Sequence, residues 1–144
     1  MIKFSRREDY SVLIVYTLAK NFDKRLVPIS EIANEYEISP LFLRNVAGDL
    51  RKAGIIKAVE GKSGGYYLTK DPNRLKIGKV LKIYSDTEHL SCCATGKTKS
   101  RSCPKDKYCI AETVWRKINK DYLDRLYAMT VTEFMNYKST KTPN

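Results

Sequence analysis

The residues best suited to chemistry are four cysteines that all fall within one short segment. Cys92, Cys93, Cys103 and Cys109 lie in the stretch SCCATGKTKSRSCPKDKYC, whose other residues are mostly small, polar or basic. Such a segment contributes little to a hydrophobic core, so its thiols need another explanation. Clustered thiols bind a metal or cluster, form disulfides, or respond to oxidants. The segment therefore indicates a metal, cluster or redox site.

The overall charge points to a polyanionic partner. The chain has 144 residues and a net charge of +11, and such a basic surface most often attracts nucleic acid. No run of about 18 apolar residues occurs, so we expect no transmembrane helix and no membrane partner. The first residues, MIKFSRREDY, carry charges where a signal peptide needs an apolar stretch. We therefore expect a cytoplasmic protein with reduced thiols, which disfavours a disulfide framework.

The elements that position this site begin with a pair of predicted helices, after a first buried helix over residues 10–21. Ser30 is expected to cap the first of the pair, whose inner face would hold Ile32, Ala33 and Tyr36. Ser39 and Pro40 offer an N-cap and a first helical residue for the second. Its apolar residues recur at helical spacing: Leu43, Val46 and Leu50. Two short helices joined by a tight turn indicate a helix-turn-helix, with a plain helical hairpin as the alternative.

A glycine-rich hairpin is predicted directly after these helices. Residues 55–59 and 66–68 favour two short strands, and the segment EGKSGG joins them. A hairpin that follows a helix-turn-helix is a wing, and its basic tip is suited to a phosphate backbone or a minor groove. A nucleotide-binding glycine loop is disfavoured because no strand, loop and helix occur in the required order.

The C-terminal third predicts a further short helix over 77–84 and a long one over 110–134, a range without proline or glycine. A helix of that length, at about 1.5 Å per residue, outreaches a small domain and is suited to pack against a twin. An intramolecular helix that covers the winged domain is the alternative. We expect a mainly α fold: a winged helix-turn-helix domain (1–84), a cysteine-rich loop (85–109), a dimerisation helix (110–135) and a disordered tail (136–144).

With these parts in order, the chain resembles the IscR/NsrR superfamily of bacterial winged-helix, iron–sulfur-cluster-binding transcription regulators. The resemblance covers nearly the whole chain and rests on KFSRREDY, on the block from ISEIANEYEISP to SGGYYL, and on CIAETVW at 109–115. It implies a homodimer that binds a double-stranded DNA operator of two-fold symmetry. It also implies an iron–sulfur cluster on three loop cysteines: Cys93 (or Cys92), Cys103 and Cys109.

The fourth cluster ligand distinguishes branches of this superfamily. Relatives with a [2Fe–2S] cluster can carry a histidine three residues after the last cysteine, where this chain has Glu112. Relatives with a [4Fe–4S] cluster can use an aspartate in the N-terminal segment of the partner subunit, and Asp9 matches that position. Glu8 is adjacent and stays open, whereas the lone His89 is more often solvated than ligating. The resemblance therefore favours [4Fe–4S] with Asp9, and Glu112 is the alternative ligand.

The candidate DNA contacts lie in three places. In the second helix of the pair, Arg44 and Asn45 suit purine edges, and Ser39 is either a contact or only a cap. Arg6 and Arg7 are expected at phosphates. The wing offers Lys62, Gly64, Gly65 and Tyr66, although Glu60 stands where relatives often have a basic residue.

Taken together, the sequence predicts a transcription regulator, a repressor, whose operator binding is switched by a cluster that responds to iron, nitric oxide or redox state. A thiol-disulfide or zinc-containing regulator of the same fold is the alternative, although zinc usually takes C-x2-C pairs that are absent here. An enzyme is disfavoured, because the chain has one histidine and no recognisable nucleophile–base arrangement.

Overall fold

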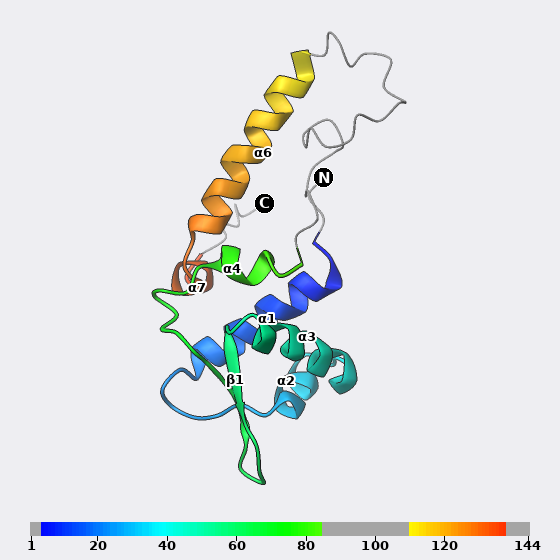
Figure 1. Cartoon of the computed structure of the whole chain (residues 1–144), viewed down its shortest axis with the longest axis vertical. Coiled ribbons are helices and arrows are strands. Elements are labelled where there is room, and N and C mark those ends of the chain that lie inside the picture. The colour runs from blue at the N-terminus through cyan, green and yellow to red at the C-terminus, as the bar shows by residue number, and fades with distance from the viewer. Residues whose placement is uncertain (1–3, 85–109, 138–144) are drawn as a thin grey trace, which may run out of the picture.

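The computed structural model of the protein describes residues 4–84 and 110–137. Within them, six of the elements form the winged-helix body, and two follow the cysteine segment (Figure 1). The body contains α1 (Arg6–Lys20), α2 (Ile29–Glu35), α3 (Pro40–Lys52), β1 (Ile56–Val59), β2 (Gly65–Leu68) and α4 (Ile77–Leu81). The C-terminal part contains α6 (Ile110–Ala128) and α7 (Val131–Met135). The predicted mainly α fold with a small β-hairpin is confirmed.

Helix α1 begins earlier than the apolar pattern predicts, because a capping box fixes its first turn. The Ser5 hydroxyl accepts a hydrogen bond from the Glu8 amide at 3.3 Å, and the Ser5 amide donates to the Glu8 carboxylate at 2.6 Å. Two amides that a helix start leaves without partners are thereby satisfied. The helix then buries Ile14, Val15 and Leu18 in the core.

Helices α2 and α3 form the expected helix-turn-helix, with one correction at the start of α2. The N-cap is Pro28, and Ser30 lies exposed inside the helix, so the predicted Ser30 cap is wrong. Proline suits this position because its fixed backbone angle matches a helix entry, whereas the sequence pattern favoured the nearest hydroxyl. The turn to α3 passes through Glu37, whose φ of 54° is the left-handed conformation that usually favours glycine.

The chain just before α2 pairs with the hairpin, on the side of β2, as a short third strand would. Strands β1 and β2 pair antiparallel, with Ile56 opposite Leu68 and Val59 opposite Gly65. Val27 adds a further bridge, in which its amide and carbonyl bond the backbone of Tyr66 at 3.1 and 2.9 Å. A Cβ at Gly65 would come within 2.9 Å of the Val27 backbone, so only glycine allows this approach.

The C-terminal helix ends at Ala128, six residues before the end that we predict for a single helix over 110–134. Thr130 begins α7 with a second capping box, in which its hydroxyl and amide pair with Glu133. The backbone around Thr130 bridges that of Lys76, and the Ile77 amide donates to the Met129 carbonyl at 2.9 Å. Residues 129–130 cannot continue a helix while they make these bonds. The Lys76 ammonium also donates to the last carbonyl of α6, that of Ala128, at 2.6 Å.

One hydrophobic core joins the described helices and the hairpin. Its fully buried members are supplied by nearly every element: Ile14, Leu18, Val27, Ile32, Leu43, Leu50, Ile56, Leu75, Ile77 and Val131. The tip of the hairpin and the far end of α6 project from this body at opposite ends of its long axis (Figure 1). No helix in residues 4–84 and 110–137 is long and apolar enough to cross a membrane.

Candidate nucleic-acid interface and switch site

The outer face of α3 presents the side chains predicted for base contact. Arg44 and Asn45 are both exposed, while Leu43, Val46 and Leu50 on the opposite face are buried. Ser39 occupies the N-cap position, but its side chain makes no capping hydrogen bond. Its hydroxyl is therefore not committed to the helix start, which keeps it available to an outside partner.

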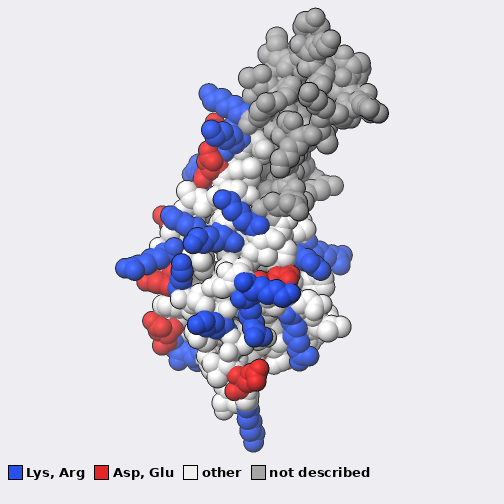
Figure 2. Space-filling model, in the orientation of Figure 1, with Lys and Arg blue, Asp and Glu red and all other residues white. Residues whose placement is uncertain are grey.

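The wing tip is exposed, but its predicted basic character is offset, because its one lysine is matched by one acid. Gly61 has a φ of 119° and forms the turn, followed by the exposed Lys62. Glu60 is exposed beside them. Figure 2 shows Lys and Arg side chains spread over the visible face from the hairpin tip to α6, with fewer acidic ones between. This charge distribution suits a polyanion.

The other predicted wing residues have structural roles in the hairpin. A Cβ at Gly64 would clash with the Val59 carbonyl oxygen, and Gly65 is buried against Val27. Tyr66 is half-buried and shares the bridge to Val27. These contacts explain two of the glycines by packing alone, so DNA contact by Gly64, Gly65 and Tyr66 stays a prediction.

The two N-terminal arginines lie at the start of α1, and both are exposed. Arg7 reaches α3, where its guanidinium lies 3.9 Å from a carboxylate oxygen of Asp49. Arg6 makes no ion pair within the described residues. The start of α1 is therefore linked to α3 through a charge pair, a contact that the sequence pattern did not indicate.

The residues just after α4 also reach this charge pair, at the point where the chain leads into the cysteine segment. Tyr84, just after α4, has a buried hydroxyl beside the Asp49 carboxylate. Burial, together with the negative charge of Asp49, raises the pKa of Tyr84 far above its ordinary value, against a smaller opposing effect of Arg7. Tyr84 is thus a neutral hydroxyl at physiological pH. The start of α1, the recognition helix α3 and the end of α4 consequently meet at one polar cluster.

The two carboxylates considered as cluster ligands differ in their surroundings. Glu8 is 1% exposed, and its carboxylate is held by the capping box of α1. Asp9, one residue further, is exposed. A metal ligand must present its oxygen to the metal, and only Asp9 does so without dismantling a helix start.

Asp9 lies at the margin of an apolar groove between α1, α4, α6 and α7. The groove encloses about 660 Å³. Apart from Glu8 and Asp9 its lining is apolar or aromatic: Phe4, Val12, Leu13, Tyr16, Tyr36, Ile77, Leu81, Leu126 and Phe134. An apolar hollow of this size on a protein surface commonly marks an interaction site.

The remaining predicted ligands cannot be placed. Cys92, Cys93, Cys103, Cys109 and His89 lie outside the described residues. Glu112 belongs to the first turns of α6, but its side chain is not among those described. Within residues 4–84 and 110–137, no three His, Cys, Asp or Glu side chains come together as a metal site.

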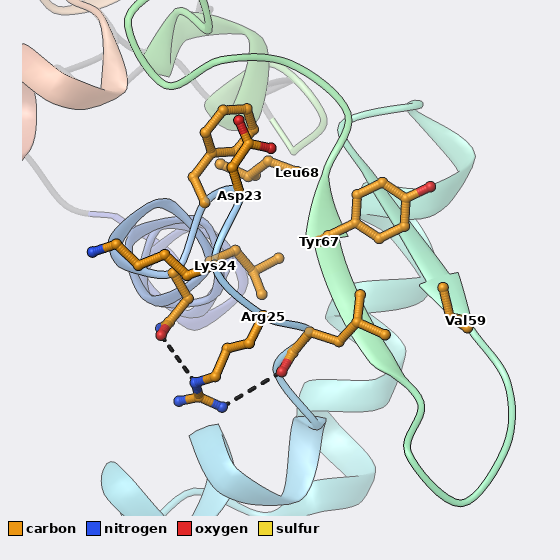
Figure 3. Close-up of a pocket in the computed structure, with 10 residues that line it drawn as sticks. Asp23, Lys24, Arg25, Val59, Tyr67 and Leu68 are labelled. Carbon is orange, nitrogen blue, oxygen red and sulfur yellow. Dashed lines mark hydrogen bonds between the residues drawn. The ribbon is translucent and has the colours of Figure 1, made fainter.

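A second, smaller hollow lies between the α1–α2 loop and the hairpin (Figure 3). Arg25, one of the two basic side chains that line it, donates to the Asn21 side chain at 3.1 Å and to both carboxylate oxygens of Glu31. Hydrogen bonding by Arg25 lowers the pKa of Glu31. The guanidinium is therefore committed to tying the loop to α2, and the hollow supports the helix-turn-helix rather than a reaction.

The order of elements defines the class of protein. A helix-turn-helix with an exposed polar face on its second helix, followed by a basic hairpin, is a winged-helix DNA-binding module. Solved structures with this fold cover most of the chain. That of CymR (YrzC), the global cysteine regulator of B. subtilis, has a TM-score of 0.76 and 22% identity, and covers 96% of this chain and 100% of its own. That of T. potens IscR has a TM-score of 0.72 and 23% identity, and covers 99% and 93%.

The sequence comparisons define the family. The chain belongs to the Rrf2 family, described as an iron-dependent transcriptional regulator, which matches residues 4–137. The regulator NsrR of Bacillus licheniformis is 31% identical over 93% of this chain and 92% of its own length. The regulator IscR of Pectobacterium atrosepticum is 26% identical over 95% and 81%. The protein is therefore a transcription regulator rather than an enzyme, as predicted.

Proposed function

We propose that the protein is a cytoplasmic, homodimeric transcription repressor whose binding to a two-fold-symmetric operator is switched by an iron–sulfur cluster. The cluster would be held by Cys93 (or Cys92), Cys103 and Cys109 of one subunit and by Asp9 of the partner subunit. The signal would be iron supply, nitric oxide or redox state. The family's iron dependence and the resemblance to IscR and NsrR support this proposal.

The contrast between Glu8 and Asp9 is the observation that carries the proposal. Glu8 is committed to the cap of α1, whereas the exposed Asp9 presents a carboxylate beside an apolar groove. Three thiolates and one carboxylate are a suitable donor set for a [4Fe–4S] cluster, which we favour over [2Fe–2S]. When bound, such a cluster supplies one iron with a harder, more readily exchanged oxygen ligand.

A second subunit has a surface on which to dock. Helix α6 exposes Val114 and Ile118, four residues apart on one face, with exposed fractions of 51% and 48%. The groove beside Asp9 offers an apolar lining to such a face. We infer that α6 of each subunit packs across the two-fold axis toward the groove of its partner, which would bring a cysteine segment near Asp9.

The switch would act through the start of α1. Asp9 lies in the same helical turn as Arg7, which contacts Asp49 on α3. Tyr84, beside Asp49, precedes the cysteine segment directly. Release of Asp9 and of the cysteine segment would therefore alter both of the elements that contact α3 at this cluster, the start of α1 and the residues after α4. A ligand that favours one arrangement shifts such an equilibrium only by its differential affinity.

Anaerobic purification tests the cluster directly. The protein should be brown, should contain iron and sulfide, and should absorb in the visible range from sulfur-to-iron charge transfer. Cys109→Ser should abolish the colour, whereas only one of Cys92→Ser and Cys93→Ser should. Colourless, iron-free protein after anaerobic reconstitution would exclude the cluster.

A thiol-disulfide or zinc-containing regulator of the same fold is the second candidate. One finding favours this alternative. Two of the solved structures with this fold are of CymR from Staphylococcus aureus, and one of these two is of the oxidized form. An iron-free protein that forms a reversible intramolecular disulfide, or that retains zinc, would support this alternative. Loss of operator binding upon oxidation would then identify the signal.

A further inference from the structure

The recognition helix carries one large apolar residue whose side chain is exposed, and neither core packing nor helix capping explains its presence there. Leu41, the second residue of α3, is 69% exposed, more than any other large apolar side chain in the described part of the chain. Its neighbours Phe42 and Leu43 turn inward toward the core. A single exposed leucine is ordinary on a protein surface, so its exposure matters only together with its position.

The position of Leu41 places it among the residues proposed to contact bases. Arg44 and Asn45 follow it by three and four residues, so the three side chains share one face of the helix. That face lies opposite the buried Val46 and Leu50. Leu41 is therefore the apolar member of an otherwise polar, outward face.

Gly48 continues the same face by one further turn. It lies in the interior of α3, and a Cβ placed there would meet no atom within 4 Å apart from the helix's own nearby backbone and its two chain neighbours. The fold therefore does not require glycine at this position, although glycine weakens a helix interior. A low surface on a recognition face lets the helix approach another molecule closely.

An apolar group at this place matches one feature of the major groove. Thymine alone presents a methyl group there, and apolar side chains recognise it by contact. Arginine and asparagine match the purine edges of guanine and adenine. We propose that Leu41 is a specificity-determining residue that contacts a thymine methyl group in each operator half-site. This inference rests on the proposed binding of α3 in the major groove.

The test removes only the methyl group. The wild-type protein selects a consensus duplex from a random pool, and each thymine in turn is replaced by deoxyuridine. At one thymine per half-site we expect the replacement to weaken wild-type binding by roughly threefold to fivefold, the loss for one buried carbon. Leu41→Ala should bind both duplexes equally and about as weakly as the wild type binds the deoxyuridine duplex.

The outcomes separate this inference from the proposed function. If Leu41→Ala retains the same thymine preference at every position, Leu41 does not contact a methyl group and the inference is wrong. If neither Leu41→Ala nor Arg44→Ala changes binding to any duplex, α3 does not contact DNA, and the inference fails together with the proposed placement of α3 in the major groove. If no duplex is selected at all, operator binding itself is absent. Because Leu41 is exposed, its variant should melt like the wild type.

Discussion

The outer face of α3 and the groove beside Asp9 are both open to solvent in the single chain, but they differ in composition. The α3 face is mostly polar, with Arg44 and Asn45 beside the single apolar Leu41. The groove is apolar apart from two carboxylates. A polar face can stay in water until a nucleic acid arrives, whereas a large apolar one favours a lasting partner. The comparison suggests that α3 acts on DNA transiently and that the groove is closed by a second subunit.

The largest effect is expected at the proposed subunit contact. Ile118→Glu would introduce a charge into an apolar interface, which typically costs about 3–5 kcal/mol when the charge stays unpaired. The dimer should dissociate at concentrations where the wild type is dimeric, as measured by sedimentation equilibrium. Lys117→Gln, an exposed neighbour on α6, serves as the matched control. An unchanged dimer in Ile118→Glu would mean that α6 does not use this face.

The next effect concerns the carboxylate at the margin of the groove. Asp9→Ala should lower the iron retained under anaerobic gel filtration by roughly tenfold or more, since even outer-shell changes at metal sites cost about 10–100-fold in affinity. Glu112→Ala should retain the cluster. The opposite order would assign the fourth ligand to Glu112 and favour the [2Fe–2S] type.

A companion variant separates ligation from folding at the same site. Glu8→Ala removes the carboxylate half of the capping box of α1, the acceptor of the Ser5 amide, and should destabilise the protein by about 1 kcal/mol, as the loss of a helix cap does. Asp9→Ala removes no such contact and should melt close to the wild type. If Glu8→Ala loses iron as completely as Asp9→Ala, the contrast between the two carboxylates would not hold.

On the polar side of the comparison, Arg44→Ala should weaken binding to the selected duplex by about 1–3 kcal/mol, measured by anisotropy titration at fixed salt. The control is Arg74→Ala, an exposed arginine in the segment before α4. Because both variants lose one positive charge, a specific base contact predicts a large difference between them. Equal losses would indicate a general electrostatic effect.

The parts of the fold that local signals determine could be predicted from the sequence, and parts set by distant contacts could not. The helix pair and the hairpin follow from apolar spacing and glycine placement. The sequence pattern does not predict the end of α6, although Thr130 and Glu133 form a T-x-x-E signature, because the uninterrupted helix propensity of residues 110–134 favours a single helix. The bridge from Thr130 to Lys76 joins segments more than 50 residues apart, and no local pattern indicates it.

The candidate site divides in the same way. Arg44 and Asn45 are exposed as predicted, and Leu41 could have been found from its spacing to them. The cluster of Arg7, Asp49 and Tyr84 could not, because it joins α1, α3 and the end of α4 across the fold. The choice between Glu8 and Asp9 also needed structure, since two adjacent carboxylates differ only in which one the helix cap buries.

The smallest effect sharpens what the α3 face is for. Gly48→Ala should raise the free energy of unfolding by about 0.5–1 kcal/mol, because alanine favours a helix interior and its Cβ meets open space. If the face enters a groove at close range, the same change should weaken duplex binding. Stability and affinity would then move in opposite directions, measured by urea denaturation and by titration. A variant that gains stability and keeps full affinity would show that DNA does not approach α3 at Gly48, and would confine the close contact to the first turns of the helix.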